Sequence, residues 1–221
     1  MEYRPYGKTG LEISSLAFGG MRFPEPRNVS AMAEIVLAAY EAGINYFDTA
    51  PGYCGDKSEK ILGHAVRQMK KGDKEFYLST KSNKPDAEGV KADLHRSLDR
   101  LGVDRIDFYH CWYILTLDGW ERRKAEGAVD ALLAAKEEGL VRHLVFSTHL
   151  PGDEVKKIYD ENIFEGVTLG YNAVNFPYRQ EGVKAAGGKR LGLVVMNPLG
   201  GGTIIENPDV FSFIRTYPGQ P

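Results

Sequence analysis

The stretch INYFDTAPGYCGDKSEKILG, residues 44–63, contains the features that decide the fold. It begins with INYFDTA, a short β-prone run that reaches Asp48. A segment with helical spacing of its apolar residues follows, KSEKILGHAVRQM at residues 57–69. The stretch therefore predicts one βα unit, in which the strand carries Asp48 and the loop after it carries Tyr53.

The same rhythm recurs along the whole chain of 221 residues. A β-hairpin is predicted at residues 2–14, with Gly7 and Gly10 as turn residues. Strands are predicted at residues 15–20, 44–50, 75–81, 105–114, 141–149, 166–174 and 191–202. Helices are predicted between them: one with Ser30 as N-cap and Gly43 as its stop, and others at residues 57–69, 86–102, 127–139, 152–161 and 178–188. We assign Trp120 to a longer loop.

Successive βα units at regular spacing favour an α/β fold of the TIM (β/α)8-barrel type over an open doubly wound sheet. Seven units are readable, and no strand is predicted in the final stretch NPDVFSFIRTYPGQP, residues 207–221. Such barrels typically need about 250 residues. We therefore expect residues 1–221 to form a single, C-terminally truncated barrel domain, whose open sheet edge favours self-association into a homo-oligomer.

Composition excludes several classes of function. The formal net charge is −2, and basic residues are spread along the chain, which argues against a nucleic-acid partner. The N-terminus lacks a signal pattern, and no apolar run is long enough to span a bilayer, so we expect a cytoplasmic protein without a membrane partner. The two cysteines, Cys54 and Cys111, have no metal-ligand spacing, and no metal site is expected. Neither a G-x-G-x-x-G fingerprint nor a P-loop is present.

Four ionisable residues fall at or near predicted strand ends, where a barrel of this type carries its chemistry: Asp48, Tyr53, Lys81 and His110. They suggest a proton relay. A lysine ammonium near Tyr53 would stabilise its phenolate, a carboxylate at Asp48 would keep Lys81 charged, and a neutral His110 would orient a carbonyl oxygen. Each residue could also have a purely structural role. Asp48 and Lys81 could form an ion pair that stabilises the fold, Tyr53 could be a packing residue, and His110 could be a buried core histidine.

These motifs resemble the aldo-keto reductases. FDTAPGY followed by SEKILG is similar to that family's Asp and Tyr motif, YLSTK to its lysine strand, and VVMNPLGGG to its seventh-strand cofactor loop. The resemblance covers almost the whole chain. It implies a (β/α)8 barrel, NADPH as cofactor, and reduction of a small-molecule carbonyl substrate by hydride transfer, with Tyr53 as the acid. YGKTGLEISSLAFGGMRFP and MNPLGGG resemble a bacterial and archaeal branch that often adds a ferredoxin-like domain. An iron–sulfur cluster would therefore belong only to a longer parent chain.

The sequence departs from the family pattern at three places. The family histidine stands five residues after the Asp of the fourth strand, where this chain has Trp112, whereas His110 lies two residues earlier. Either His110 reaches the pocket through a local bulge, or Trp112 replaces the histidine and forms a pocket wall. Thr168 stands where many members have a glutamine that holds the nicotinamide amide, and Met196 where an aromatic residue stacks on the ring. The eighth strand, which grips the 2′-phosphate, is not readable.

The remaining cofactor residues implied by the resemblance lie at the ends of the other strands. They are Gly20 and Met21 after the first strand, Ser147 and Thr148 at the end of the fifth, Asn172 on the sixth, and Met196, Leu199, Gly200 and Gly201 on or after the seventh. Glycines there would let backbone N–H groups approach a pyrophosphate.

Two other functions remain open. One is a barrel enzyme that uses Lys81 as a Schiff-base nucleophile, as class I aldolases do. The other is a catalytically inactive protein, either a nucleotide-binding sensor or a fragment.

Overall fold

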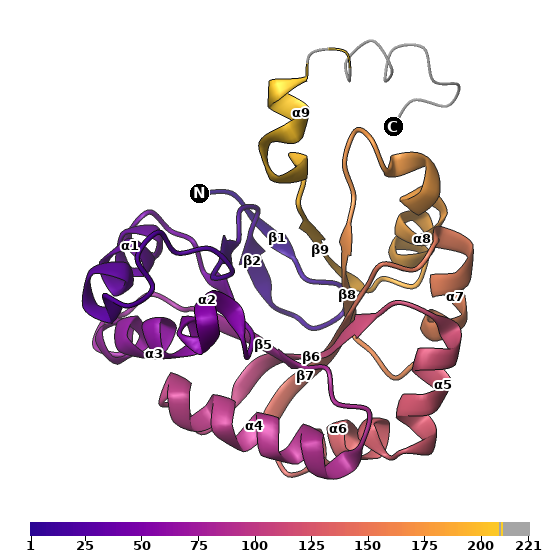
Figure 1. Cartoon of the computed structure of the whole chain (residues 1–221), viewed down its shortest axis with the longest axis horizontal. Coiled ribbons are helices and arrows are strands. Elements are labelled where there is room, and N and C mark those ends of the chain that lie inside the picture. The colour runs from indigo at the N-terminus through magenta and orange to yellow at the C-terminus, as the bar shows by residue number, and fades with distance from the viewer. Residues whose placement is uncertain (208, 210–221) are drawn as a thin grey trace.

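The structure is a computed structural model that describes residues 1–207 and 209. A curved parallel sheet lies at its centre (Figure 1). Its seven strands follow one another in chain order from β3 to β9, each hydrogen-bonded to the next. This is the incomplete barrel that the seven βα units predict. The strands are β3 (Phe18–Gly19), β4 (Tyr46–Asp48), β5 (Tyr77–Ser82), β6 (Ile106–Ile114), β7 (Val141–Thr148), β8 (Gly166–Gly170) and β9 (Gly192–Met196).

Helices cover the outer, convex face of the sheet, as Figure 1 shows. Their apolar stripes pack on the strands, and β5 is buried along its whole length because helices lie on one side and the barrel interior on the other. The main helices are α1 (Val29–Glu41), α3 (Ser58–Met69), α4 (Ala87–Leu101), α5 (Leu117–Ala125), α6 (Ala128–Glu137), α7 (Gly152–Asp160) and α8 (Phe176–Gly188). Short turns form α2 (Tyr53–Asp56), the 3₁₀ helix Gly200–Gly202 and α9 (Thr203–Glu206).

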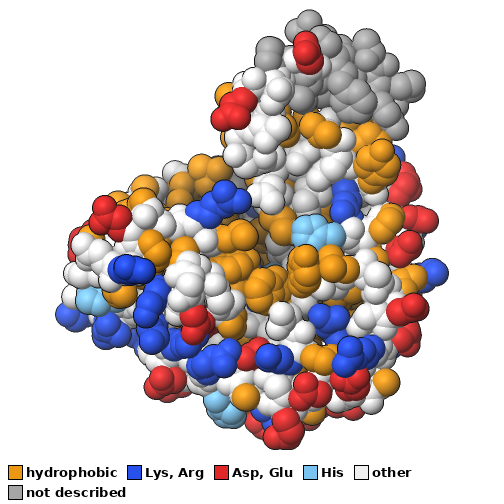
Figure 2. Space-filling view, in the orientation of Figure 1, with side chains coloured by type: hydrophobic (Ala, Val, Ile, Leu, Met, Phe, Trp, Pro, Cys, Tyr) orange, Lys and Arg blue, Asp and Glu red, His pale blue; other side chains and the backbone are white. Residues whose placement is uncertain are grey.

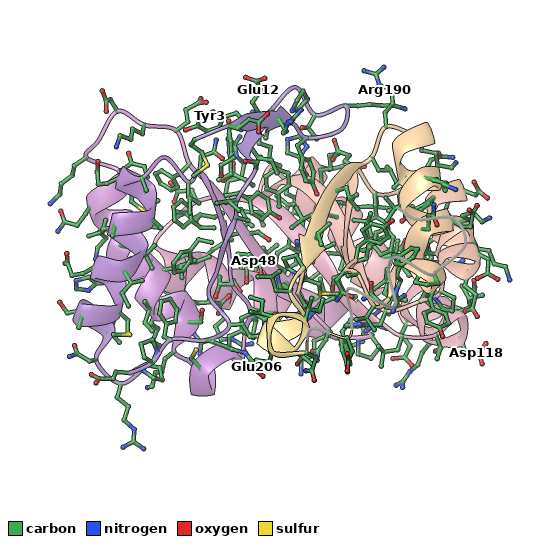
Figure 3. All side chains as sticks on the ribbon, turned by 90° about the horizontal axis from the view of Figure 1, so that it is seen from above. Tyr3, Glu12, Asp48, Asp118, Arg190 and Glu206 are labelled. Atoms are coloured by element: carbon green, nitrogen blue, oxygen red, sulfur yellow. The ribbon has the colours of Figure 1, made fainter. Side chains whose placement is uncertain are left out.

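The predicted hairpin is present, as β1 (Tyr3–Pro5) and β2 (Glu12–Ser14), and it lies at one end of the molecule. In Figure 3, Tyr3 and Glu12 lie at one edge, Glu206 at the opposite edge and Asp48 between them. The hairpin places Tyr6, which is almost completely buried, inside the barrel against the first residues of β8 and β9. A Cβ at Gly192 would lie 2.1 Å from the Tyr6 ring, so glycine is required there.

The structure corrects three details of the predicted elements. Helix α1 is capped by Asn28, whose side chain accepts from the Ala31 N–H, and Ser30 lies inside the first turn. Trp120 lies in helix α5 and not in a loop, because Thr116 caps a helix there. Strand β8 ends at Gly170, so Asn172 lies in the loop beyond it.

The two edge strands of the sheet, β3 and β9, do not pair with each other in the part of the chain that the structure describes. Of the final stretch in which no strand is predicted, residues 208 and 210–221 lie outside the described residues. Among the described helices, none has the length and apolar character to cross a membrane.

Candidate active site

An ion pair between Lys81 and Asp48 lies inside the barrel near the carboxyl ends of β4 and β5. Asp48 is directly opposite Ser79 in the parallel register, and Lys81 follows Ser79 by two residues, so both β5 side chains point to the same face. The Lys81 side chain is only 4% exposed, whereas that of Asp48 is 25% exposed. The predicted pairing of the two residues is therefore present.

Two further side chains extend this ion pair into the barrel. Ser79 Oγ donates to Asp48 Oδ1 at 2.7 Å and lies 3.0 Å from His110 Nε2. Since a carboxylate can only accept, the serine hydrogen goes to Asp48, and the serine oxygen accepts the Nε2–H of the imidazole. We call Asp48, Ser79, Lys81 and His110, together with Tyr53 above them, the acid–base cluster.

His110 is fully buried, and its ring does not reach the mouth of the barrel. Burial and the positive charge of Lys81 hold its pKa well below the ordinary value, while a contact with the Phe146 backbone acts weakly in the opposite direction. The other ring nitrogen, Nδ1, has no hydrogen-bond partner among the described residues. The histidine is thus neutral as predicted, but it contacts Ser79 where a contact with a substrate carbonyl was expected.

Trp112 occupies the mouth in its place. Its ring meets that of Tyr53 edge to face, with centroids 5.6 Å apart and planes at 86°. Strand β6 does contain a bulge, but its register shift lies between Cys111 and Ile114, beyond His110. The bulge therefore does not bring His110 to the mouth, and Trp112 is the residue that lies beside Tyr53.

Tyr53 is the first residue of α2, in the connection that follows β4, and it lies over the ion pair. Lys81 Nζ is 5.8 Å from the centroid of its ring, within range of a cation–π contact. Burial, and then the negative charge of Asp48, raise the Tyr53 pKa well above its ordinary value. The predicted lowering of the Tyr53 pKa by Lys81 is not found, because burial, and then the negative charge of Asp48, act in the opposite direction. Tyr53 is therefore a protonated phenol at neutral pH.

The loop that carries Tyr53 has an unusual backbone. Cys54, Gly55 and Asp56 all have positive φ, and only the glycine adopts this conformation without cost. Two side chains hold the loop in place: Cys54 Sγ donates to the Met21 carbonyl at 3.1 Å, and the Asp56 carboxylate pairs with both terminal nitrogens of Arg100. The tyrosine is thus fixed from both sides of its loop.

A buried carboxylate on helix α3 also helps to hold the loop that carries Tyr53. Glu59, 1% exposed on α3, accepts from Thr80 Oγ1 at 2.8 Å and Ser97 Oγ at 2.6 Å, and pairs with Arg100 at 3.2 Å. Its charge is therefore fully compensated, as a buried carboxylate requires. Arg100 links Glu59 to Asp56, so helices α3 and α4 together position the Tyr53 loop.

On the other half of the barrel, several predicted cofactor residues line one cavity of ≈ 300 Å³: Asn172, Met196, Gly200 and Gly201. Three basic residues, Arg22, His149 and Arg179, line it as well, and no acidic side chain does so among the described residues. We call this cavity the cationic pocket. It lies at the ends of β7, β8 and β9, and Figure 2 shows Lys and Arg side chains beside the apolar hollow on this face.

The other predicted cofactor residues do not line this cavity. Ser147 Oγ accepts from the Tyr113 N–H at 3.1 Å, and the fully buried Thr148 donates to the Ile114 carbonyl at 2.9 Å, so both hydroxyls support the β6 bulge. Gly20 is buried, with its N–H bonded to the Asp48 carbonyl. Met21 and Leu199 are exposed.

The sequence matches known proteins over most of its length. The profile of the aldo/keto reductase family matches residues 15–211. The chain belongs to this family. It is 32% identical over 170 residues to the L-galactose dehydrogenase of Arabidopsis thaliana, a match that covers 72% of this chain and 52% of the dehydrogenase. The chain thus matches only about half the length of that relative.

Two bacterial proteins extend the comparison. An uncharacterised oxidoreductase of Bacillus subtilis, YqkF, is 25% identical over 221 residues, covering 94% of this chain and 68% of that protein. An aldo-keto reductase from Bacillus halodurans, solved in its holo form, has the same fold, with a TM-score of 0.77 and 22% identity over all of this chain and 78% of that one. These relatives make the chain a member of an oxidoreductase family built on this barrel.

A nicotinamide dinucleotide, the cofactor type of aldo-keto reductases, fits the residues present. The Thr168 hydroxyl, opposite Ser147 in the register of β7 and β8, is buried without a hydrogen-bond partner among the described residues. An amide group placed between these two strands would supply that partner. Met196 offers a polarisable thioether against which a ring can pack. The orphaned hydroxyl is the structural observation that favours the fit.

Sequence reasoning missed several residues of this site: Ser79, Glu59, Arg100, Arg22, His149 and Arg179. Ser79 carries a signal that could have revealed it, because a serine two residues before Lys81 on one strand must share the lysine's face. Glu59, a carboxylate within the apolar face of a helix, carries a second signal. The basic residues of the cationic pocket come from distant segments, and no local pattern connects them.

Proposed function

We propose that this chain reduces an aldehyde or a ketone with NADPH, and that Tyr53 is the general acid. The observation that carries the proposal is the position of a protonated Tyr53 over the buried Lys81–Asp48 ion pair. When bound, NADPH would supply a hydride to the carbonyl carbon. Ser147, Thr168 and Met196 are the residues that would hold its nicotinamide end.

The chain's own residues would then handle the proton. A carbonyl oxygen near the Tyr53 hydroxyl gains negative charge as its carbon is reduced, and an alkoxide is a stronger base than a phenolate, so the proton passes from tyrosine to product. Lys81 lies close enough to stabilise the phenolate that remains, since opposite charges within a few ångströms favour the ionised form. Trp112 would form one wall of the substrate site and exclude water from it.

Lys81 is poorly suited to the alternative role of a Schiff-base nucleophile. A nucleophilic lysine must present a neutral amine to its substrate. Here the side chain is 4% exposed and its Nζ is engaged in the ion pair with the Asp48 carboxylate, so it does not present a free amine to a substrate. The reductase is therefore the better-supported function.

The test is consumption of NADPH with a panel of aldehydes and ketones. L-galactose is assayed in the opposite direction, as a hydride donor that reduces NADP+, because one relative is named as its dehydrogenase. Replacing Tyr53 by Phe removes only the transferable proton, and we expect turnover to fall by about 100- to 10,000-fold. The matched control is Tyr3→Phe, which removes an exposed hydroxyl at the opposite end of the molecule.

Equal turnover by the two tyrosine variants would contradict the role of Tyr53. Absence of turnover by the unaltered chain with every substrate, together with absence of NADPH binding, would contradict the proposed function itself. Trapping of a carbonyl substrate on Lys81 by borohydride would support the aldolase-type alternative instead.

A further inference from the structure

The bulge near the end of β6 turns two consecutive aromatic residues towards the barrel mouth. The register shifts between Cys111 and Ile114, so that Trp112 and Tyr113 together lie opposite Ser147 of β7. In a regular strand, Tyr113 would share a face with Cys111, which is buried in the main apolar core. Ile114 takes that place in the core instead, and Tyr113 is 49% exposed.

The two aromatic side chains belong to a row of rings. The Trp112 ring meets that of Tyr53 with centroids 5.6 Å apart, and that of Tyr113 with centroids 6.4 Å apart and planes at 61°. Tyr113 in turn meets the imidazole of His149, the residue after β7, at 5.6 Å and 77°. These separations lie in the range that aromatic pairs prefer. The row therefore extends from the acid–base cluster across the mouth to the end of β7.

The backbone at Tyr113 has a conformation that tyrosine does not favour. Its φ is 65°, in the left-handed region, where a bulky side chain is an outlier. The conformation is held by the Tyr113 N–H, which donates to Ser147 Oγ at 3.1 Å, and by Arg123 Nη2, which donates to the Trp112 carbonyl at 3.1 Å. Because the tyrosine is half exposed, burial of its ring does not explain why the strain is kept. Bulges and strain of this kind occur where a side chain must be aimed at a ligand.

We propose that Trp112 and Tyr113 form an aromatic corner that selects a carbonyl substrate with a planar aromatic ring, and that Tyr113 determines this specificity. The inference rests on the proposed function and names its substrate class. A carbonyl oxygen at the Tyr53 hydroxyl leaves the rest of the substrate beside the Trp112 ring, within reach of Tyr113. The faces and edges of aromatic rings carry opposite partial charges, so an aromatic substrate gains an attraction that a saturated ring lacks.

The test compares benzaldehyde with cyclohexanecarbaldehyde, whose six-membered ring is saturated. The ratio of their kcat/KM values is measured for the unaltered chain, Tyr113→Asn, Tyr113→Phe and Tyr3→Asn, so that the intrinsic reactivity of the aldehydes cancels between variants. Asparagine removes the ring and tolerates the left-handed backbone, and phenylalanine keeps the ring. Tyr3 is the matched control, an exposed tyrosine at the opposite edge from Glu206 in Figure 3.

We expect Tyr113→Asn to lower the preference for benzaldehyde by about 3- to 10-fold, the magnitude of one aromatic contact. Tyr113→Phe and Tyr3→Asn should keep the preference of the unaltered chain. Tyr113→Gly, which removes the backbone strain as well as the ring, repeats the measurement and should match Tyr113→Asn. A ratio within twofold of the unaltered chain for both ring-deleting variants would overturn the inference and leave the proposed function intact.

Binding of the corresponding alcohols, benzyl alcohol and cyclohexylmethanol, separates this inference from the proposed function. It is measured by calorimetry with and without NADP+. A preference for benzyl alcohol that Tyr113→Asn loses, in a chain that reduces neither aldehyde, would support the aromatic corner while contradicting the proposed function. In such a chain, equal binding of the two alcohols, or binding of neither, would overturn the inference as well.

Discussion

The two halves of the barrel mouth differ in how their polar groups are satisfied. In the acid–base cluster on β4–β6, the charges of Asp48 and Lys81 compensate each other, and Ser79 and His110 complete a chain of hydrogen bonds. In the cationic pocket on β7–β9, the buried Nη1 of Arg179 has no partner in the described structure. The comparison suggests that the first half is assembled before any ligand arrives, whereas the second half is completed by its ligand.

The largest expected effect in this comparison is the loss of the buried lysine. Lys81→Met leaves the Asp48 carboxylate without its counter-charge, and we expect the free energy of unfolding to fall by about 3 kcal/mol. This is the low end of the range for buried pairs, because Asp48 is partly exposed. Urea denaturation measures the change.

The control for that variant is Lys189→Met on the other half of the molecule. Lys189 pairs with Asp160 at 2.8 Å, but both side chains are substantially exposed, so the expected cost is at most about 1 kcal/mol. A similar loss for both variants would show that the Lys81–Asp48 pair is no better compensated than an ordinary surface pair, and the contrast between the halves would fail.

A smaller effect is expected at the link between the ion pair and the histidine. Ser79→Ala removes the donor to Asp48 and leaves His110 Nε2 buried without an acceptor, at a cost of about 2 kcal/mol. The control Ser15→Ala alters an exposed serine and should change stability by less than about 0.5 kcal/mol. If Ser79→Ala unfolds at the same urea concentration as the unaltered chain, the hydrogen-bonded chain does not stabilise the cluster.

The smallest effect concerns the pH dependence of the Tyr53 loop. The hydrogen bonds from Arg100, and then that from the Gly52 N–H, lower the Asp56 pKa to about 2. Since the folded pKa is below the ordinary value of about 3.9, the ionised group stabilises the fold above about pH 4, and this contribution is lost as the pH falls towards 2. Asp56 is half exposed, so the contribution is under about 1 kcal/mol.

Urea denaturation between pH 4 and pH 2 tests this dependence. Asp56→Asn should lose less stability over that range than the unaltered chain, whereas Asp73→Asn, at an exposed loop position, should follow the unaltered chain. Parallel pH profiles for Asp56→Asn and the unaltered chain would mean that the Arg100 contact does not couple to folding.

Much of the barrel was predictable because each βα unit is encoded locally. The apolar spacing locates strand β5 and helix α4, and the structure adds that Asp86 is the N-cap of α4 and that Gly102 ends it in the left-handed conformation. Helix α5 was missed, since its residues carry only a weak apolar pattern and its start depends on the Thr116 cap. Local patterns thus predict elements well and their exact ends less well.

The site was predictable only in part, for a different reason. Asp48 and Lys81 could be paired because both end neighbouring strands and carry opposite charges. The partner of His110 could not be named, because it depends on the register that places Lys81 opposite His110 and Asp48 opposite Ser79. The basic residues of the cationic pocket lie in the loops after β3 and β7 and in the first turn of α8, which meet only in the folded chain, so neither Arg22 nor Arg179 carries a signal in the sequence.

The most direct test of the account is a titration of the folded chain with NADPH, followed by nicotinamide fluorescence, for the unaltered protein and for Tyr53→Phe. If the acid–base cluster is preformed and the cofactor is held by the other half of the mouth, both proteins bind NADPH with the same affinity, and only the unaltered one reduces a carbonyl substrate. Absence of saturable NADPH binding by a demonstrably folded sample would contradict the account.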